Sequence, residues 1–84
     1  MWTQDEAIAF ECACDAIAHM IAIYSASLCD EKKKPEPDLA HIVEIKNKID
    51  ELARERRSLH VADHEKIAMI RREYGAHVRA HIAS

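Results

Sequence analysis

Residues 7–29 read AIAFECACDAIAHMIAIYSASLC, and this stretch decides the fold. Eighteen of its 23 residues are apolar or cysteine, far more than the inward stripe of a surface helix requires. The larger ones follow the alternating four- and three-residue spacing of a packing seam: Phe10, Cys14, Ile17, Ile21, Tyr24 and Leu28. Glu11, Asp15 and His19 form a narrow polar stripe between them. The pattern predicts a helix that other parts of the protein must cover.

The composition of the whole chain indicates an all-α fold. The 84 residues include one Gly, two Pro and four aromatic residues, too few for the turns and strands of a β protein. The hydrophobic share is 49 % and the charged share 32 %, as in ordered globular proteins. A chain of this length forms one domain at most. We therefore expect a single all-helical domain over residues 1–84.

Local signals divide the domain into three helices. Thr3 and Glu6 match a capping box at the start of the first helix, and KKKPEP stops that helix. Asp63 is a suitable cap for the last helix. The predicted segments are a helix at about 3–31, a linker at 32–37, a helix at about 38–59 and a helix at about 63–83.

The two later helices each carry one apolar stripe. In the second helix it comprises Ile42, Ile45, Ile49 and Leu52, with Leu39 at its edge. In the third it comprises Ile67, Ile70, Tyr74, Val78 and His81, out of phase with the second. Because residues 58–63 contain neither Gly nor Pro, one continuous helix with a register shift is the alternative. The expected architecture is a small antiparallel three-helix bundle, or a helical hairpin with a bent second arm.

Two narrow stripes do not cover the first helix on all sides. They cover the side of Phe10 and Leu28 and leave the far shoulder open, at Ile8, Cys12, Ala16 and Ile23. Small domains with surplus apolar helix commonly oligomerise. These four residues are therefore the predicted interaction surface, for a second copy in a homodimer or for another protein.

Charge is unevenly distributed along the chain. Residues 1–31 hold six acids and no Lys or Arg, whereas residues 32–84 hold nine acids and twelve bases, for a net charge of −3. The simpler interpretation is attraction between the helices of one molecule. The alternative is an acidic face that meets a basic partner.

The cysteines and the N-terminus favour the cytoplasm. Cys12, Cys14 and Cys29 are an odd number without the spacing of a disulfide framework, so reduced thiols are expected. Asp5 and Glu6 stand where a signal peptide would be basic. The longest stretch of the first helix without Asp, Glu, Lys or Arg is residues 16–29, which includes His19 and is short for a membrane span. No membrane association is therefore expected.

Six histidines raise metal binding as the main alternative function. His60 and His64, and likewise His77 and His81, have the four-residue spacing at which two imidazoles of a helix converge on one transition-metal ion. We take His77 and His81, beside Tyr74, as the candidate metal ligands. Neither pair has the Glu-x-x-His or HExxH context of known metal sites, so the primary expectation is a protein without a cofactor.

Catalysis and DNA binding have weaker support. Glu11 and Asp15 are better explained as a solvent stripe than as a catalytic pair, and one Gly cannot build a phosphate loop. A helix–turn–helix DNA binder that displays Arg71, Arg72 and Arg79 is a lesser alternative. Acids interrupt its basic face and the chain is net acidic, so nucleic acid is not the expected partner.

These observations together predict a non-catalytic helical protein–protein interaction module. Small helical chains without catalytic residues often work as accessory proteins that bind and mask or regulate one partner protein. Antitoxins, secretion chaperones and anti-defence proteins are examples of this role. The accessory role is expected by analogy with such proteins, and no motif in the sequence identifies the partner.

Overall fold

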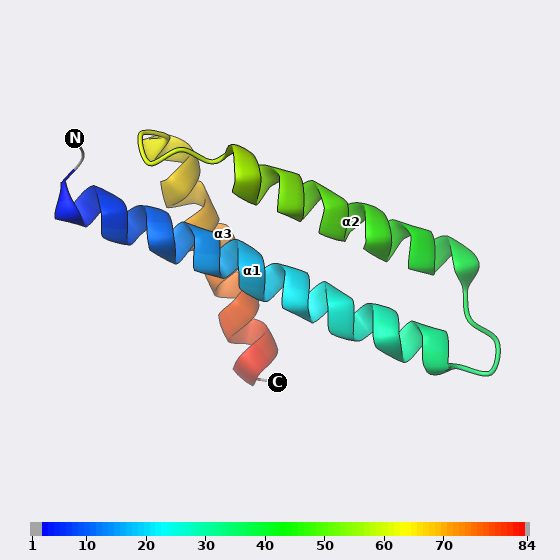
Figure 1. Ribbon diagram of the computed structural model, residues 1–84. Coiled ribbons are helices and arrows are strands. Elements are labelled where there is room, and N and C mark those ends of the chain that lie inside the picture. The colour runs from blue at the N-terminus through cyan, green and yellow to red at the C-terminus, as the bar shows by residue number, and fades with distance from the viewer. Residues whose placement is uncertain (1–2, 84) are drawn as a thin grey trace.

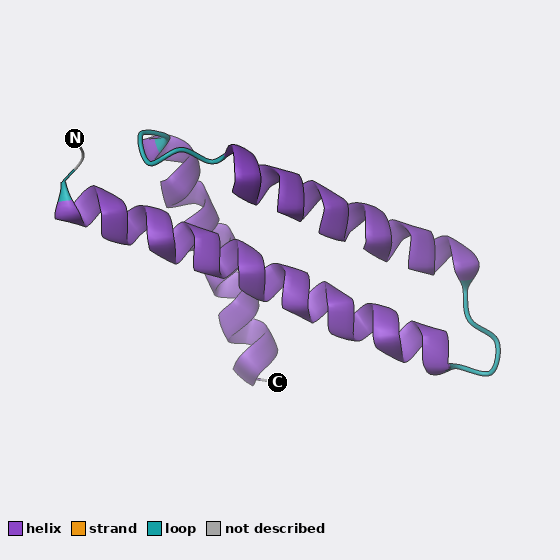
Figure 2. Cartoon of the chain, in the orientation of Figure 1, coloured by secondary structure: helices purple, strands orange, loops and turns teal. Residues whose placement is uncertain are grey.

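The computed structural model describes residues 3–83 and is all-α. Its three helices are α1 (Gln4–Lys33), α2 (Leu39–Ser58) and α3 (His64–Ala83), and the described residues contain no strand. Figure 2 shows the helices joined by two loops, one after α1 and one after α2. The predicted all-α fold of three helices is confirmed, and α2 and α3 are separate helices.

α1 begins at the predicted capping box. The Thr3 hydroxyl accepts a hydrogen bond from the Glu6 amide, and Glu6 Oε1 accepts one from the Thr3 amide, both at 3.1 Å. Asp5 and Glu6 also place negative charge at the positive end of the helix dipole. The helix then continues to Lys33, two residues beyond the expected end. Its 30 residues span roughly 45 Å, so α1 sets the long dimension of the molecule.

Both later helices pack against α1, and their backbones do not pack against each other. Figure 1 shows α2 running antiparallel beside α1, whereas α3 crosses behind the N-terminal half of α1 at a steep angle. The fold is therefore an antiparallel α1–α2 hairpin with a third helix laid across it. In the view of Figure 1 the C-terminus emerges on the side of α1 away from α2.

The core lies where the three helices meet. Its buried side chains are Ala13, Ile17, Met20, Leu52, Leu59, Ile67, Ile70 and Val78. Ile17 and Ile70 are fully buried, and each such side chain stabilises the fold by about 1.5–3 kcal/mol. Phe10 and Tyr24 of the predicted seam pack against this core in half-buried positions. Ala13 and Met20 lie beside that seam and are buried because α3 covers a second side of α1.

The apolar stripe of α2 faces α1 with one exception. Ile42, Ile45 and Leu52 are buried, as the periodicity predicts. Leu39 is 74 % exposed, so its predicted place at the edge of the stripe is wrong. Leu39 is the first residue of α2, where the helix leaves the linker, and the burial of the stripe begins only at Ile42.

The loop between α2 and α3 is a compact turn anchored by two residues. Leu59 buries its side chain in the core, and Asp63 Oδ2 accepts a 2.9 Å hydrogen bond from the His60 amide. A second bond, from the Asp63 amide to the His60 carbonyl, closes the turn at 3.0 Å. These bonds reverse the chain direction without Gly or Pro.

The molecule is open for its size. Its radius of gyration is 14.9 Å, whereas a compact chain of this length has about 12 Å. Its accessible surface is 6064 Å². A compact protein of 9.6 kDa exposes roughly 5,100 Å². The principal dimensions of 52 × 27 × 14 Å describe a thin slab in which much of α1 has only one layer of cover.

Candidate interaction surface

A shallow furrow runs along the line where α1 and α3 cross. Three neighbouring depressions share their lining residues and form one continuous feature. We call it the α1/α3 furrow. Its lining includes small side chains of both helices: Ala9, Cys12 and Ala16 of α1, and Ala68 and Gly75 of α3. Small side chains along a groove let another helix backbone approach closely.

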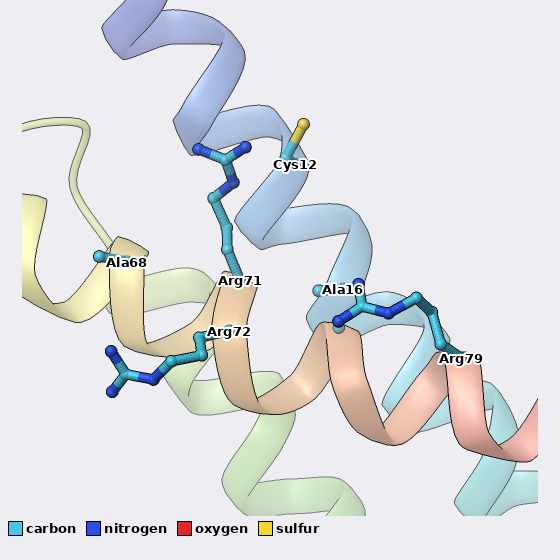
Figure 3. Close-up of a pocket in the computed structure, with 7 residues that line it drawn as sticks. Cys12, Ala16, Ala68, Arg71, Arg72 and Arg79 are labelled. Atoms are coloured by element: carbon cyan, nitrogen blue, oxygen red, sulfur yellow. The ribbon is translucent and has the colours of Figure 1, made fainter.

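The α3 edge of the furrow is basic. Arg71, Arg72 and Arg79 line it, and Figure 3 shows Arg71 beside the α1 turn that carries Cys12. Arg79 lies across Ala16, whereas Arg72 points away from α1. Among residues 3–83 no carboxylate lies within 4.0 Å of any of these three guanidinium groups. The furrow therefore presents positive charge that the molecule itself does not pair.

Gly75 makes room for one of these arginines. It lies inside α3 with ordinary helical geometry, so no left-handed backbone requires a glycine there. A Cβ atom at this position would stand 3.3 Å from Arg79 Nη1. A glycine inside a helix lowers its stability by about 1 kcal/mol relative to Ala. Because Gly75 has no side chain, the Arg79 guanidinium has room to lie close to the α3 backbone at the furrow.

The α1 edge of the furrow carries the opposite charge. Asp5 lines the furrow near the start of α1, and Asp15 and His19 line it near the middle of that helix. All three side chains are exposed. The two edges of the furrow thus have complementary charges, acidic on α1 and basic on α3.

The predicted surface residues of α1 fall into two groups. Ile8 is 48 % exposed and Cys12 is exposed, so the described chain leaves both open to solvent. Ala16 and Ile23 are half-buried and pack against the core. Cys12 and Ala16 both line the α1/α3 furrow. The structure therefore joins half of the predicted surface to arginines on another helix.

The three cysteines are free thiols in different surroundings. Cys12 and Cys29 are exposed, whereas Cys14 is half-buried. Burial raises the pKa of the Cys14 thiol, against a smaller opposing effect of Arg56. Cys14 therefore belongs to the packing of α1, and Cys12 to its outer face.

Within the described chain, the histidine pairs gather no further metal-ligating side chains around them. His77 and His81 lie one turn apart on α3 and are exposed. His60 lies in the turn before α3, so His60 and His64 do not share a helix. No group of three or more His, Cys, Asp or Glu side chains among residues 3–83 is arranged to hold a metal ion. His77 and His81 remain a two-ligand candidate.

His64 has a structural partner instead. Its Nε2 atom lies 2.9 Å from Glu6 Oε2, which ties the start of α3 to the start of α1. This hydrogen bond is the main cause that lowers the pKa of Glu6. The contact joins residues 58 positions apart and was not indicated by the sequence pattern.

Sequence reasoning also missed Glu31, a buried carboxylate at the end of α1. It is only 4 % exposed, and it accepts hydrogen bonds from Lys34 Nζ at 2.8 Å and from the Asp38 amide at 3.0 Å. His41 Nδ1 lies 3.4 Å away. The bond from Lys34, followed by that from Asp38, lowers the pKa of Glu31 to about 2. Glu31 therefore fastens the linker and the start of α2 to α1.

α1 also has the composition of a membrane-spanning helix. It is long and apolar enough to cross a bilayer by those measures alone, a property it shares with core helices of soluble proteins and with signal sequences. Only 22 % of its most apolar 18-residue stretch is buried. Most of this apolar stretch thus has incomplete cover within one molecule.

Comparison with known proteins found no relative. No protein-family model, curated protein or solved structure matches the chain.

Proposed function

We propose that the chain is a small protein–protein interaction module that acts without catalysis and binds, masks or regulates a partner protein. The observation that carries this proposal is the α1/α3 furrow, an open depression with arginines along one edge that no carboxylate of the described chain pairs. Accessory proteins such as antitoxins, secretion chaperones and anti-defence proteins work in this manner.

The shape of the furrow suits a helical partner. Amphipathic helices dock into grooves through side chains three and four residues apart. The small residues Cys12, Ala16 and Gly75 leave space for such side chains. Arg71 and Arg79 would pair with carboxylates of the docked helix, which fixes its orientation.

The openness of the molecule supports the same proposal. The accessible surface exceeds that of a compact chain of this mass by roughly a fifth. Ile8 adds apolar area next to the furrow. Burial of such area is the dominant favourable contribution to protein association. We further propose that the module works in the cytoplasm, where its free thiols stay reduced.

Co-purification tests the proposal. A tagged chain is isolated from the cells that naturally produce it, together with Cys12→Arg, which blocks the furrow, and Val43→Arg, a matched change on the exposed face of α2. We expect a stoichiometric partner, either another protein or the untagged natural copy of the chain, with wild type and Val43→Arg, and its loss with Cys12→Arg. Equal capture by all three proteins, or no stoichiometric partner with any of them, would contradict the proposal.

A further inference from the structure

We propose that the occupant of the α1/α3 furrow is α1 of a second copy of this chain, lying antiparallel along the first. This inference rests on the proposed interaction function and names the partner of the same surface. Three observations lead to it: a second packing seam on α1, the charges at the two edges of the furrow, and the amount of surplus surface.

The outer face of α1 carries a seam of its own. The exposed residues Asp5, Ile8, Cys12, Asp15 and His19 follow the alternating three- and four-residue spacing of a helix–helix contact. Exposed Ala22 and Ala26 continue the same spacing. The face toward the core uses a different seam, through Phe10 and Ile17. α1 can therefore pack on α2 and α3 with one side and on another helix with the other.

Two-fold symmetry sets the register of the pairing. The furrow follows α1 from Asp5 to His19, and the midpoint of this stretch is Cys12. In a symmetric antiparallel pair the residue on the axis faces its own copy. Cys12 then faces Cys12, and Ile8 of one copy lies over Ala16 of the other. The small Ala16 side chain leaves room for Ile8.

This register also pairs the charges. Arg71 lines the furrow beside Asp5 and Ala9. In this register Asp15 of the second copy lies opposite Ala9, and therefore near Arg71. Arg79 lines the furrow beside Asp15 and His19. Asp5 of the second copy lies opposite His19, and therefore near Arg79. Each copy thus offers two carboxylates to two guanidinium groups, and symmetry doubles the set. Complementary charges of this kind fix orientation and exclude other registers.

The surplus surface is of the size that a dimer needs. The chain exposes 6064 Å² where a compact chain exposes roughly 5,100 Å². A stable interface takes about 800 Å² from each partner. One face of each molecule, centred on the α1 seam, would supply this area.

A charge-exchange experiment tests the inference. Arg71→Glu/Arg79→Glu places acids on the α3 edge as well as on the α1 edge, and Asp5→Lys/Asp15→Lys places bases on both edges. We expect the dissociation constant of each variant with itself to rise about tenfold or more. An equimolar mixture restores both sets of charge pairs, and we expect it to form a heterodimer with near wild-type affinity in sedimentation equilibrium.

Matched variants on α2 control for net charge. Lys46→Glu/Arg57→Glu and Glu44→Lys/Asp50→Lys change exposed residues outside the furrow and should leave the dimer unchanged. Weakening by these controls, or a mixture that fails to associate, would overturn the inference. A monomeric wild type that binds anionic phosphatidylglycerol vesicles or duplex DNA would also overturn it. A monomer that captures another protein through the furrow would overturn self-pairing but leave the proposed function standing.

Cysteine crosslinking tests the register independently. Cys14→Ser/Cys29→Ser retains only Cys12, and Cys12→Ser/Cys14→Ser retains only the other exposed thiol, Cys29. Under mild copper-catalysed oxidation we expect the first protein to form a disulfide dimer about tenfold faster than the second, because only Cys12 lies on the symmetry axis. Equal rates would overturn the register centred on Cys12.

Discussion

The Tyr74 hydroxyl donates a 2.7 Å hydrogen bond to Glu55 Oε1 and thereby joins α3 to α2, two helices whose backbones do not pack together. Both side chains are half-buried above the core. The bond ties α3, which crosses α1 at a steep angle (Figure 1), to the helix that runs antiparallel beside α1.

Removal of the Tyr74 hydroxyl should loosen this arrangement. We expect Tyr74→Phe to lower the free energy of unfolding in urea by about 1 kcal/mol, the usual effect of one hydrogen bond. Tyr24→Phe, a change in the other tyrosine, is the matched control because the Tyr24 hydroxyl forms no hydrogen bond with another side chain among residues 3–83. Equal losses from the two substitutions would contradict a specific role for the Tyr74–Glu55 bond.

The same bond should appear in the alkaline titration. Burial, and after it the hydrogen bond to Glu55, raises the pKa of Tyr74 to about 12. Because folding raises this pKa, the stabilisation that the neutral Tyr74 side chain gives to the fold is complete below pH about 10. It is lost as the pH rises toward 12. Phenolate absorbance of Tyr24→Phe, which leaves only Tyr74, should show a midpoint near pH 12. A midpoint near 10 in the folded protein would contradict this account.

Glu31 should govern stability in acid. Its pKa is lowered to about 2, so the stabilisation is present above the unfolded value of 4.5 and is lost as the pH falls toward 2. We expect Glu31→Gln to be less stable at neutral pH and to lose less stability between pH 5 and 2, read by circular dichroism. Glu44→Gln, an exposed change on α2, should retain the wild-type profile. Parallel profiles for wild type and Glu31→Gln would refute this role.

Gly75 should be a site where stability can rise. We expect Gly75→Ala to increase the free energy of unfolding by up to about 1 kcal/mol, because Ala favours helix and the nearest atom, Arg79 Nη1, ends a flexible side chain. Ala76→Gly, at the next and exposed position, should lower it by a similar amount. Destabilisation by Gly75→Ala would show that the Arg79 side chain cannot move away from residue 75 without loss.

The thiols should react in two classes. We expect Cys12 and Cys29 to react rapidly with a thiol reagent and Cys14 slowly, because burial raises its pKa and restricts access. All three should react together in denaturant. A single fast phase for three thiols in the folded protein would show that Cys14 is not packed.

Much of the fold follows from local pattern, and much of the site does not. The capping box at Thr3 and the stripes through Ile45 and Ile70 are readable from spacing because helix geometry alone determines them. The exposed seam at Ile8 and Cys12 follows from the excess of apolar residues in residues 7–29.

The missed features depend on contacts between distant residues. Glu31 looks like one more charge at a helix end, and only the path of the linker brings Lys34 and Asp38 onto its carboxylate. The arginines of α3 become part of a surface with α1 only because the two helices cross, which places Arg79 over Ala16 (Figure 3). A crossing angle is a property of packed helices, so no single-helix pattern predicts it.

Sedimentation equilibrium of the unmodified protein at micromolar concentration tests the central claim most directly. The account predicts a reversible dimer with twice the 9.6 kDa mass of one chain, weakened by salt because Arg71 and Arg79 pair with carboxylates at its edge. A single species of 9.6 kDa, unchanged up to hundreds of micromolar and indifferent to salt, would contradict it.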